Sequence, residues 1–269
     1  MTKKKSNGNG NGNSRNTNVN GNGNGKKETI NFEKKLMTII ENGQEKSIPL
    51  NNKQIAEVLY GSKLQVRGKN KRQKDLLTSI GTKEITIAVG PAGVGKSYIS
   101  VAKALELLAH SENNYQKIYI VTPNVELDGS HLGFMPGDLM EKLGYYLFST
   151  FYLIDKVIGK QNRKRLLELG IIESLAIGFL RGVNIDNSIL ICEEAQNTTT
   201  LQMKTMITRI GFNSKFIISG DLEQADIRNQ NGLQDALDKF SNFEEIGIVK
   251  FEKNDIVRNP IIGKILSKY

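Results

Sequence analysis

Two adjacent carboxylates, Glu193 and Glu194, come directly after the apolar run "NSILIC" at residues 187–192. Repulsion between like charges and the loss of hydration both oppose this arrangement at the end of a buried strand. It becomes favourable when a cation or a reacting proton lies beside the carboxylates. The pair therefore predicts a cation site. A solvated helix start, where acidic residues interact with the helix dipole, is the alternative.

A glycine-rich segment elsewhere in the chain can supply that cation. Residues 90–97, "GPAGVGKS", fit G-x-x-x-x-G-K-[ST], in which backbone N–H groups and a helix N-terminus face nucleotide phosphates. Lys96 would reach the terminal phosphates of ATP, and Ser97 would hold Mg²⁺. A glycine-rich turn that happens to carry a lysine is the alternative. The predicted nucleotide-binding residues are Gly90, Pro91, Ala92, Gly93, Val94, Gly95, Lys96, Ser97 and Tyr98.

Ligands of parallel sheets gather at the carboxyl ends of the strands, so Glu193 and Glu194 would face the nucleotide. One carboxylate would belong to the Mg²⁺ shell, and the other would orient or deprotonate an attacking water. Gln224, in "ISGDLEQAD" at residues 218–226, follows another buried strand and could sense the terminal phosphate. A turn rich in glycine and aspartate is the competing interpretation of that segment.

The elements that must position these groups alternate between strands and helices from residue 84 onward. Several of the strands are uniformly apolar, which is typical of a mostly parallel sheet covered by helices on both faces. The pattern predicts an α/β fold. Strands are expected at 84–90, 117–123, 171–177, 187–192, 215–220 and 245–251. Helices are expected at 97–110, 137–158, 160–169, 200–210, 232–240 and 256–269.

The N-terminal part has a different composition. Residues 1–28 are basic and rich in asparagine and glycine, with too few apolar side chains to offset the entropy of ordering, and are predicted to be a disordered tail. Residues 29–83 are interpreted as a small, mostly helical, basic preface, and 84–269 as the core. The net charge of +9 belongs to this N-terminal third. Its densest stretch, 63–74, favours a polyanion partner, although a solvated charged surface has the same composition.

Two function classes are disfavoured by composition. Cys192 is the single cysteine, and the chain has two histidines, so an internal disulfide is excluded and a Cys/His metal site is disfavoured. No apolar run is long enough to span a bilayer. We therefore expect a cytoplasmic protein with no membrane partner.

Five segments in order resemble one family: "GPAGVGKS", "LGFMPGDLMEK", "GFLRG", "EEAQNTTTLQMKTMITRIGFNSKFIISGD" and "DIVRNPIIGKIL". Together they are similar to the PhoH-like ATPases, whose core resembles that of superfamily-one helicases. The resemblance covers roughly residues 65–269. It implies a P-loop NTPase with a RecA-like sheet, ATP binding, Mg²⁺-dependent hydrolysis and often a ring-shaped homo-oligomer.

The resemblance also assigns roles to particular residues. Glu193 takes the metal position together with Ser97, Glu194 the water-activating position and Gln224 the phosphate-sensing position. Gln73 lies where helicase relatives read the adenine edge, a task that suits an amide, although a surface amide in a basic helix is an even alternative. Further candidates are Arg258, as a finger reaching a nucleotide or as a salt-bridge partner of Asp255, and Arg181, facing phosphate or nucleic acid.

This sequence departs from the family pattern at two positions. Glutamate at position 193 replaces the usual aspartate, and its extra methylene would shift the Mg²⁺ contact or route it through water. Thr122 replaces an arginine that usually precedes the proline at position 123, which removes one basic contact.

Three functions compete on these observations. The first is an ATPase that acts on RNA or single-stranded nucleic acid. The second is a nucleotide-gated binding or oligomerisation module with little or no turnover, which Glu193 favours. The third, a small-molecule kinase, ranks last because the sequence contains no arginine-rich lid pattern.

Overall fold

The computed structural model describes residues 16–19, 27–41, 44–61, 64–123, 139–227 and 229–257. The chain forms two compact units, Met1–Asn51 and Asn52–Tyr269. Within the described ranges, no helix is both long enough and apolar enough to cross a membrane.

The first unit contains a four-stranded antiparallel sheet in the order β1-β2-β3-β4. Its strands are β1 (Asn16–Val19), β2 (Lys27–Asn31), β3 (Leu36–Glu41) and β4 (Gln44–Pro49). This differs from the prediction of a disordered tail followed by a helical preface. Threonine and isoleucine occur in both β2 and β3, and such β-branched residues favour an extended backbone over a helix. For 1–15 and 20–26, outside the described residues, disorder stays a prediction.

Two helices of the predicted preface, α1 (Asn52–Leu59) and α2 (Lys71–Thr82), belong to the second unit. Both contact α3 (Lys96–His110), and α2 also contacts two strands of the parallel sheet. They bury Ile55, Leu76 and Ile80, which are apolar side chains that a detached preface would leave in water. The predicted boundary between residues 83 and 84 therefore differs from the observed division after Asn51.

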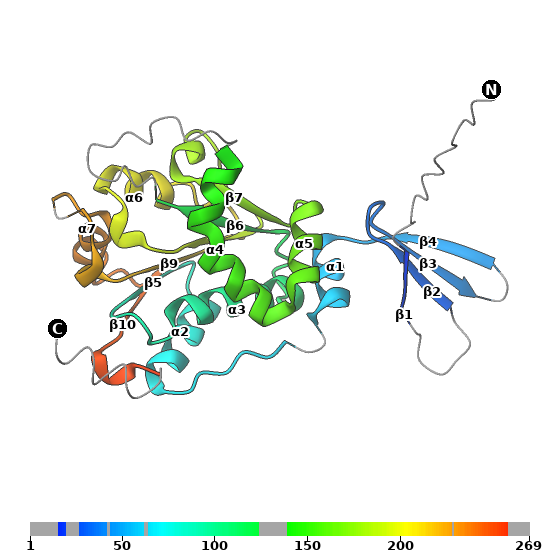
Figure 1. Ribbon diagram of the computed structural model, residues 1–269, viewed down its shortest axis with the longest axis horizontal. Helices are drawn as coiled ribbons and strands as arrows, with labels where there is room; N and C mark the ends of the chain where they lie inside the picture. Colours follow the sequence, from blue (N-terminus) through cyan, green and yellow to red (C-terminus); the bar gives the residue numbers. More distant parts are fainter. Residues whose placement is uncertain are drawn as a thin grey trace, which may run out of the picture. The chain divides into compact units, whose positions relative to one another are not determined.

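The second unit is built on a six-stranded sheet in the order β10-β5-β9-β8-β6-β7, and all neighbouring strands are parallel (Figure 1). Every residue of β5, β8 and β9 is buried, as the uniformly apolar runs predict for central strands. The strands are β5 (Ile85–Val89), β6 (Lys117–Thr122), β7 (Ile172–Ala176), β8 (Ser188–Cys192), β9 (Lys215–Gly220) and β10 (Ile246–Lys250).

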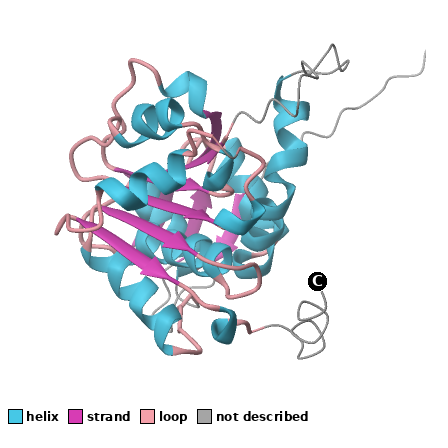
Figure 2. Cartoon of the chain, turned by 90° about the vertical axis from the view of Figure 1, so that its left-hand side faces the viewer, coloured by secondary structure: helices cyan, strands magenta, loops and turns pink. Residues whose placement is uncertain are grey.

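Helices cover both faces of this sheet, so the predicted α/β fold class is confirmed (Figure 2). Besides α1, α2 and α3, they are α4 (Leu139–Ile158), α5 (Lys160–Glu168), α6 (Thr200–Ile207) and α7 (Gly232–Lys239). Short 3-10 turns follow the strands: η2 (Ile177–Leu180), η3 (Ala195–Asn197), η4 (Leu222–Gln224) and η5 (Lys253–Asp255). Most of the helix predicted at 256–269 lies outside the described residues.

The core between the sheet and its helices fixes the strand ends that matter for function. Phe216, Leu190 and Ile218 on the central strands are fully buried with Met206 of α6 and Leu233 of α7. Burial of each such side chain contributes about 1.5–3 kcal/mol. The carboxyl ends of β5, β8 and β9 are thereby held beside one another on a rigid base.

Candidate active site

The segment between β5 and α3 curves tightly around the start of α3. Gly95, the N-cap of α3, has a left-handed backbone with φ 94° and ψ 14°. At Gly90 (φ 145°) a Cβ atom would lie 2.5 Å from the carbonyl oxygen of Phe251. A larger residue at either position would be strained, so the glycines allow a loop whose N–H groups converge. The helix begins at Lys96, as the sequence predicts.

Lys96 folds back over this loop. Its ammonium donates hydrogen bonds to the carbonyl oxygens of Gly90 and Pro91, the second at 2.9 Å, and the residue is buried. The lysine charge is therefore held against the loop. In this position the ammonium would lie beside the terminal phosphates of a bound nucleotide.

Gln73 of α2 is buried behind the loop. Its Oε1 accepts a hydrogen bond from the Lys69 backbone N–H at 2.8 Å, and its Nε2 donates to the carbonyl oxygen of Val94 at 2.8 Å. A Cβ atom at Gly95 would lie 2.8 Å from the same Nε2. The amide thus supports the loop backbone directly. Its predicted role in reading adenine stays a prediction.

Glu193 and Glu194 follow the end of β8 and face the loop. Burial raises the pKa of Glu193 to about 7, and the charge of Glu194 adds to this rise. The nearby hydroxyls of Ser97 and Ser219 and the ammonium of Lys96 act in the opposite direction. The structure thus contains the electrostatic conflict that the sequence of two adjacent carboxylates implies.

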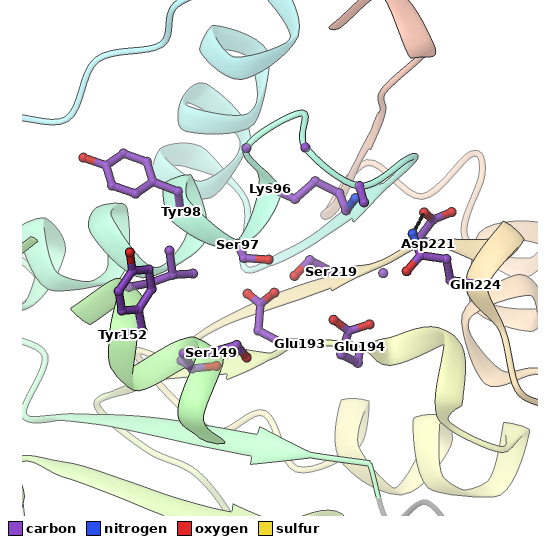
Figure 3. A pocket seen from close by; sticks show the side chains of 16 residues that line it. Lys96, Ser97, Tyr98, Ser149, Tyr152, Glu193, Glu194, Ser219, Asp221 and Gln224 are labelled. Atoms are coloured by element: carbon purple, nitrogen blue, oxygen red, sulfur yellow. Dashed lines mark hydrogen bonds between the residues drawn. The ribbon is translucent and has the colours of Figure 1, made fainter. Parts of the chain in front are cut away.

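A magnesium ion fits these residues. Ser97, Glu193 and Ser219 point toward one another in Figure 3, and the buried Glu193 Oε1 has no hydrogen-bond partner among the described residues. Mg²⁺ is typically bound by one or two carboxylates together with phosphate oxygens and water. The described residues contain no group of three or more His, Cys, Asp or Glu side chains suited to an all-protein metal cage. Ser97 and Glu193 would therefore share the ion with a nucleotide phosphate.

Hydrogen bonds link the second carboxylate to the next strand. Gln196 donates from Nε2 to Glu194 Oε2 at 2.6 Å, and its Oε1 accepts from the backbone N–H of Asp221 at 3.0 Å. Gln224 donates from Nε2 to Asp221 Oδ2 at 2.7 Å. Gly220 permits this approach, because a Cβ atom there would lie 2.7 Å from Gln196 Oε1. One network therefore connects Glu194 with Gln224.

The groups surround one pocket of about 380 Å³ (Figure 3). It is lined by the P-loop, the start of α3, both glutamates and the end of β9 with Gln224. One side of the pocket comes from α4, which sequence reasoning did not include. The α4 residues are Ser149, Thr150, Tyr152 and Leu153.

Sequence reasoning also missed Gln196, Ser219 and Asp221 as members of the site. The "AQN" that follows the two glutamates was the available signal for Gln196, because a buried amide needs partners. Among the described residues, the predicted Gly90, Pro91 and Val94 belong to the loop but do not line this pocket, and neither do Gln73 and Arg181. Arg181 is exposed after η2, and Arg258 lies outside the described residues, as does most of "LGFMPGDL".

A family model and several known proteins match this chain. The family model described as PhoH-like protein matches residues 65–269. A PhoH-like protein of Bacillus subtilis (strain 168) is 37% identical over 206 residues, which cover 76% of this chain and 64% of the relative. Protein PhoH of Escherichia coli (strain K12) is 36% identical over 208 residues, which cover 76% of this chain and 58% of that protein. The chain thus spans less than two thirds of the length of either relative.

Among solved structures, the large terminase of a thermophilic bacteriophage matches with a TM-score of 0.43 and 9% identity. That match covers 75% of this chain and 50% of the terminase chain. The family model covers well over half of the chain, and the first relative is 37% identical. The chain therefore belongs to the PhoH-like protein family.

Proposed function

We propose that this protein is a Mg²⁺-dependent ATPase that couples ATP hydrolysis to action on RNA or single-stranded nucleic acid. The observation that carries the proposal is the buried carboxylate oxygen of Glu193, which has no hydrogen-bond partner among the described residues and faces Ser97 at the start of α3. Burying a carboxylate beside a second one is costly, and a metal-bound triphosphate on the adjacent loop would offset that cost.

The loop, the two glutamates and Gln224 would each have a task in phosphoryl transfer to water. The backbone of residues 90–97 binds the phosphates, and Lys96 offsets their charge. Glu194 orients the attacking water and accepts its proton, while Gln224 contacts the terminal phosphate. A Mg²⁺ ion held by Ser97 and Glu193 supplies charge stabilisation when it is bound. Such catalysis consists almost entirely of positioning and electrostatics.

The nucleic-acid half of the proposal rests on charge near the loop. Basic side chains are exposed or half-exposed on and just before α2, namely those of Arg67, Lys69, Lys71 and Lys74. Gln73 lies among them and supports the P-loop at Val94. A polyanion bound by these cations would therefore contact the element that supports the phosphate loop. The resemblance to the family adds a homo-oligomer and a cytoplasmic location to the proposal.

Phosphate release from ATP tests the enzyme. The full chain should release phosphate with Mg²⁺, release little in EDTA, and respond to single-stranded RNA. Lys96→Ala should abolish most of the release. Equal release by both proteins would end the hydrolysis proposal, and no RNA binding at low salt would end the nucleic-acid proposal.

A second function is favoured by one observation, the glutamate at position 193. Its carboxylate lies one methylene farther from the backbone than that of aspartate. A nucleotide-gated binding or oligomerisation module with little turnover would tolerate this shift. A marked rise in turnover in Glu193→Asp would support this second function, and an unchanged or lower rate would count against it. Mass measurement with and without ATP would report any change in assembly.

A further inference from the structure

Two exposed tyrosines line the same pocket as the phosphate loop. Tyr98 lies in the first turn of α3 and is 46% exposed, and Tyr152 lies on α4 and is 51% exposed. The helices α3 and α4 contact each other. In Figure 3 the two rings occupy the end of the view opposite Gln224 and Asp221. The polar, charged end of the pocket is therefore distinct from an aromatic end.

The order in which the P-loop, residues 90–97, contacts the phosphates determines which part of a nucleotide would lie at each end of the pocket. Lys96 reaches the β- and γ-phosphates, and the backbone N–H groups of the loop hold the α- and β-phosphates. A triphosphate bound in this way would run from Gln224 and Lys96 toward the residues that begin α3. Its α-phosphate would lie nearest Ser97 and Tyr98, and the nucleoside would extend beyond it.

We propose that Tyr98 and Tyr152 form the nucleoside subsite, with the base stacked on an aromatic ring. The inference rests on the proposed ATP binding and adds Tyr152 of α4 to the site. The ammonium of Lys156 lies 4.6 Å from the ring centroid of Tyr152, so one face of this ring is occupied. Because the residue is half exposed, its other face can receive a base, and every base presents a π-face.

The position of Gln73 agrees with this assignment. Both polar atoms of its amide already bond to the backbone, at Lys69 and Val94. Gln73 is 4% exposed and does not line the pocket. The base is therefore recognised by aromatic contact at the α4 side of the pocket, while Gln73 supports the loop from behind.

Binding of ATP compared with inorganic tripolyphosphate tests the subsite, because tripolyphosphate has no base. Titration calorimetry on the full chain with Mg²⁺ would give both affinities. Tyr152→Ala and Tyr98→Ala should each weaken ATP about tenfold and leave tripolyphosphate unchanged. Tyr152→Phe should bind ATP like the wild type. Phe148→Ala removes another exposed aromatic of α4, outside the pocket, and should change neither affinity.

Two outcomes would overturn the subsite. One is ATP affinity that stays at the wild-type level in both alanine variants. The other is an equal loss of ATP and tripolyphosphate affinity, which would place the effect on the phosphate loop. Failure of the proposed function would look different. In that case the wild-type chain would bind neither ATP nor tripolyphosphate, or it would bind ATP without hydrolysing it.

Discussion

At the scale of single residues, Glu193 is a group whose chemistry is strongly altered by its surroundings. Burial raises its pKa from an ordinary value of 4.5 to about 7. The folded, nucleotide-free chain thus binds a proton more tightly than the unfolded chain. Stability from this group is fully present below the unfolded pKa and falls as the pH rises from about 4.5 to about 7.

Glu193→Gln should remove this pH dependence. We compare the unfolding free energy of the variant with that of the wild type, both in EDTA. The variant-minus-wild-type difference should be more favourable at pH 8 than at pH 4, by at most about 3 kcal/mol. Urea unfolding at the two pH values measures it. Glu245→Gln, at an exposed position, is the matched control and should follow the wild type. A difference that does not change with pH would contradict the assignment.

Gln196 controls the neighbouring carboxylate through hydrogen bonds. It is 1% exposed, donates a hydrogen bond to the Glu194 carboxylate and accepts one from the backbone N–H of Asp221. Gln196→Leu keeps the volume but frees Glu194 and leaves a buried N–H unpaired, which costs about 1–3 kcal/mol of stability. Because Gln196 does not line the pocket, kcat should fall about tenfold or more with little change in KM. A raised KM with unchanged kcat would mean that Gln196 acts in binding instead.

At the scale of secondary-structure elements, α2 is coupled to the phosphate loop through one side chain. Gln73→Ala removes the side chain that supports Val94. The buried carbonyl oxygen of Val94 then lacks the amide donor of Gln73. We expect ATP and tripolyphosphate to lose affinity together, by about tenfold. Gln65→Ala, an exposed amide nearby, should have no effect. Loss of ATP affinity alone would instead support the adenine-reading role predicted from the sequence.

The parallel strands and the loop between β5 and α3 were predictable because their signals are local. Uniform apolar runs mark buried strands, and the glycine spacing marks the turn before Lys96. The link from Glu194 through Gln196 to Asp221 depends on β9 lying beside β8, and strand order leaves no trace in residue spacing. The contribution of Tyr152 depends on which side of α4 packs toward the loop. The strands of the first unit were missed because each is short and they follow a basic, asparagine- and glycine-rich stretch, although β3 is itself mostly apolar.

At the scale of the whole molecule, the basic charge is divided between the first unit and the second. Residues 1–51 hold nine basic and four acidic residues, and another basic group lies on and before α2. The second unit has its own buried core and contains the whole described pocket. A chain that begins at Asn52 should therefore fold and keep the ATP affinity of the full chain, as titration calorimetry on the two chains would measure.

Nucleic-acid binding should respond differently to this truncation. Each phosphate that a basic residue neutralises releases counterions, so removing the basic residues of the first unit should weaken binding to single-stranded RNA at low salt. The slope of log affinity against log salt should also become shallower, by about 0.7 for each phosphate that is no longer neutralised. Fluorescence anisotropy with a labelled RNA at several salt concentrations measures both. An unchanged slope in the truncated chain, with ATP affinity intact, would assign the polyanion contacts to the basic side chains around α2 alone.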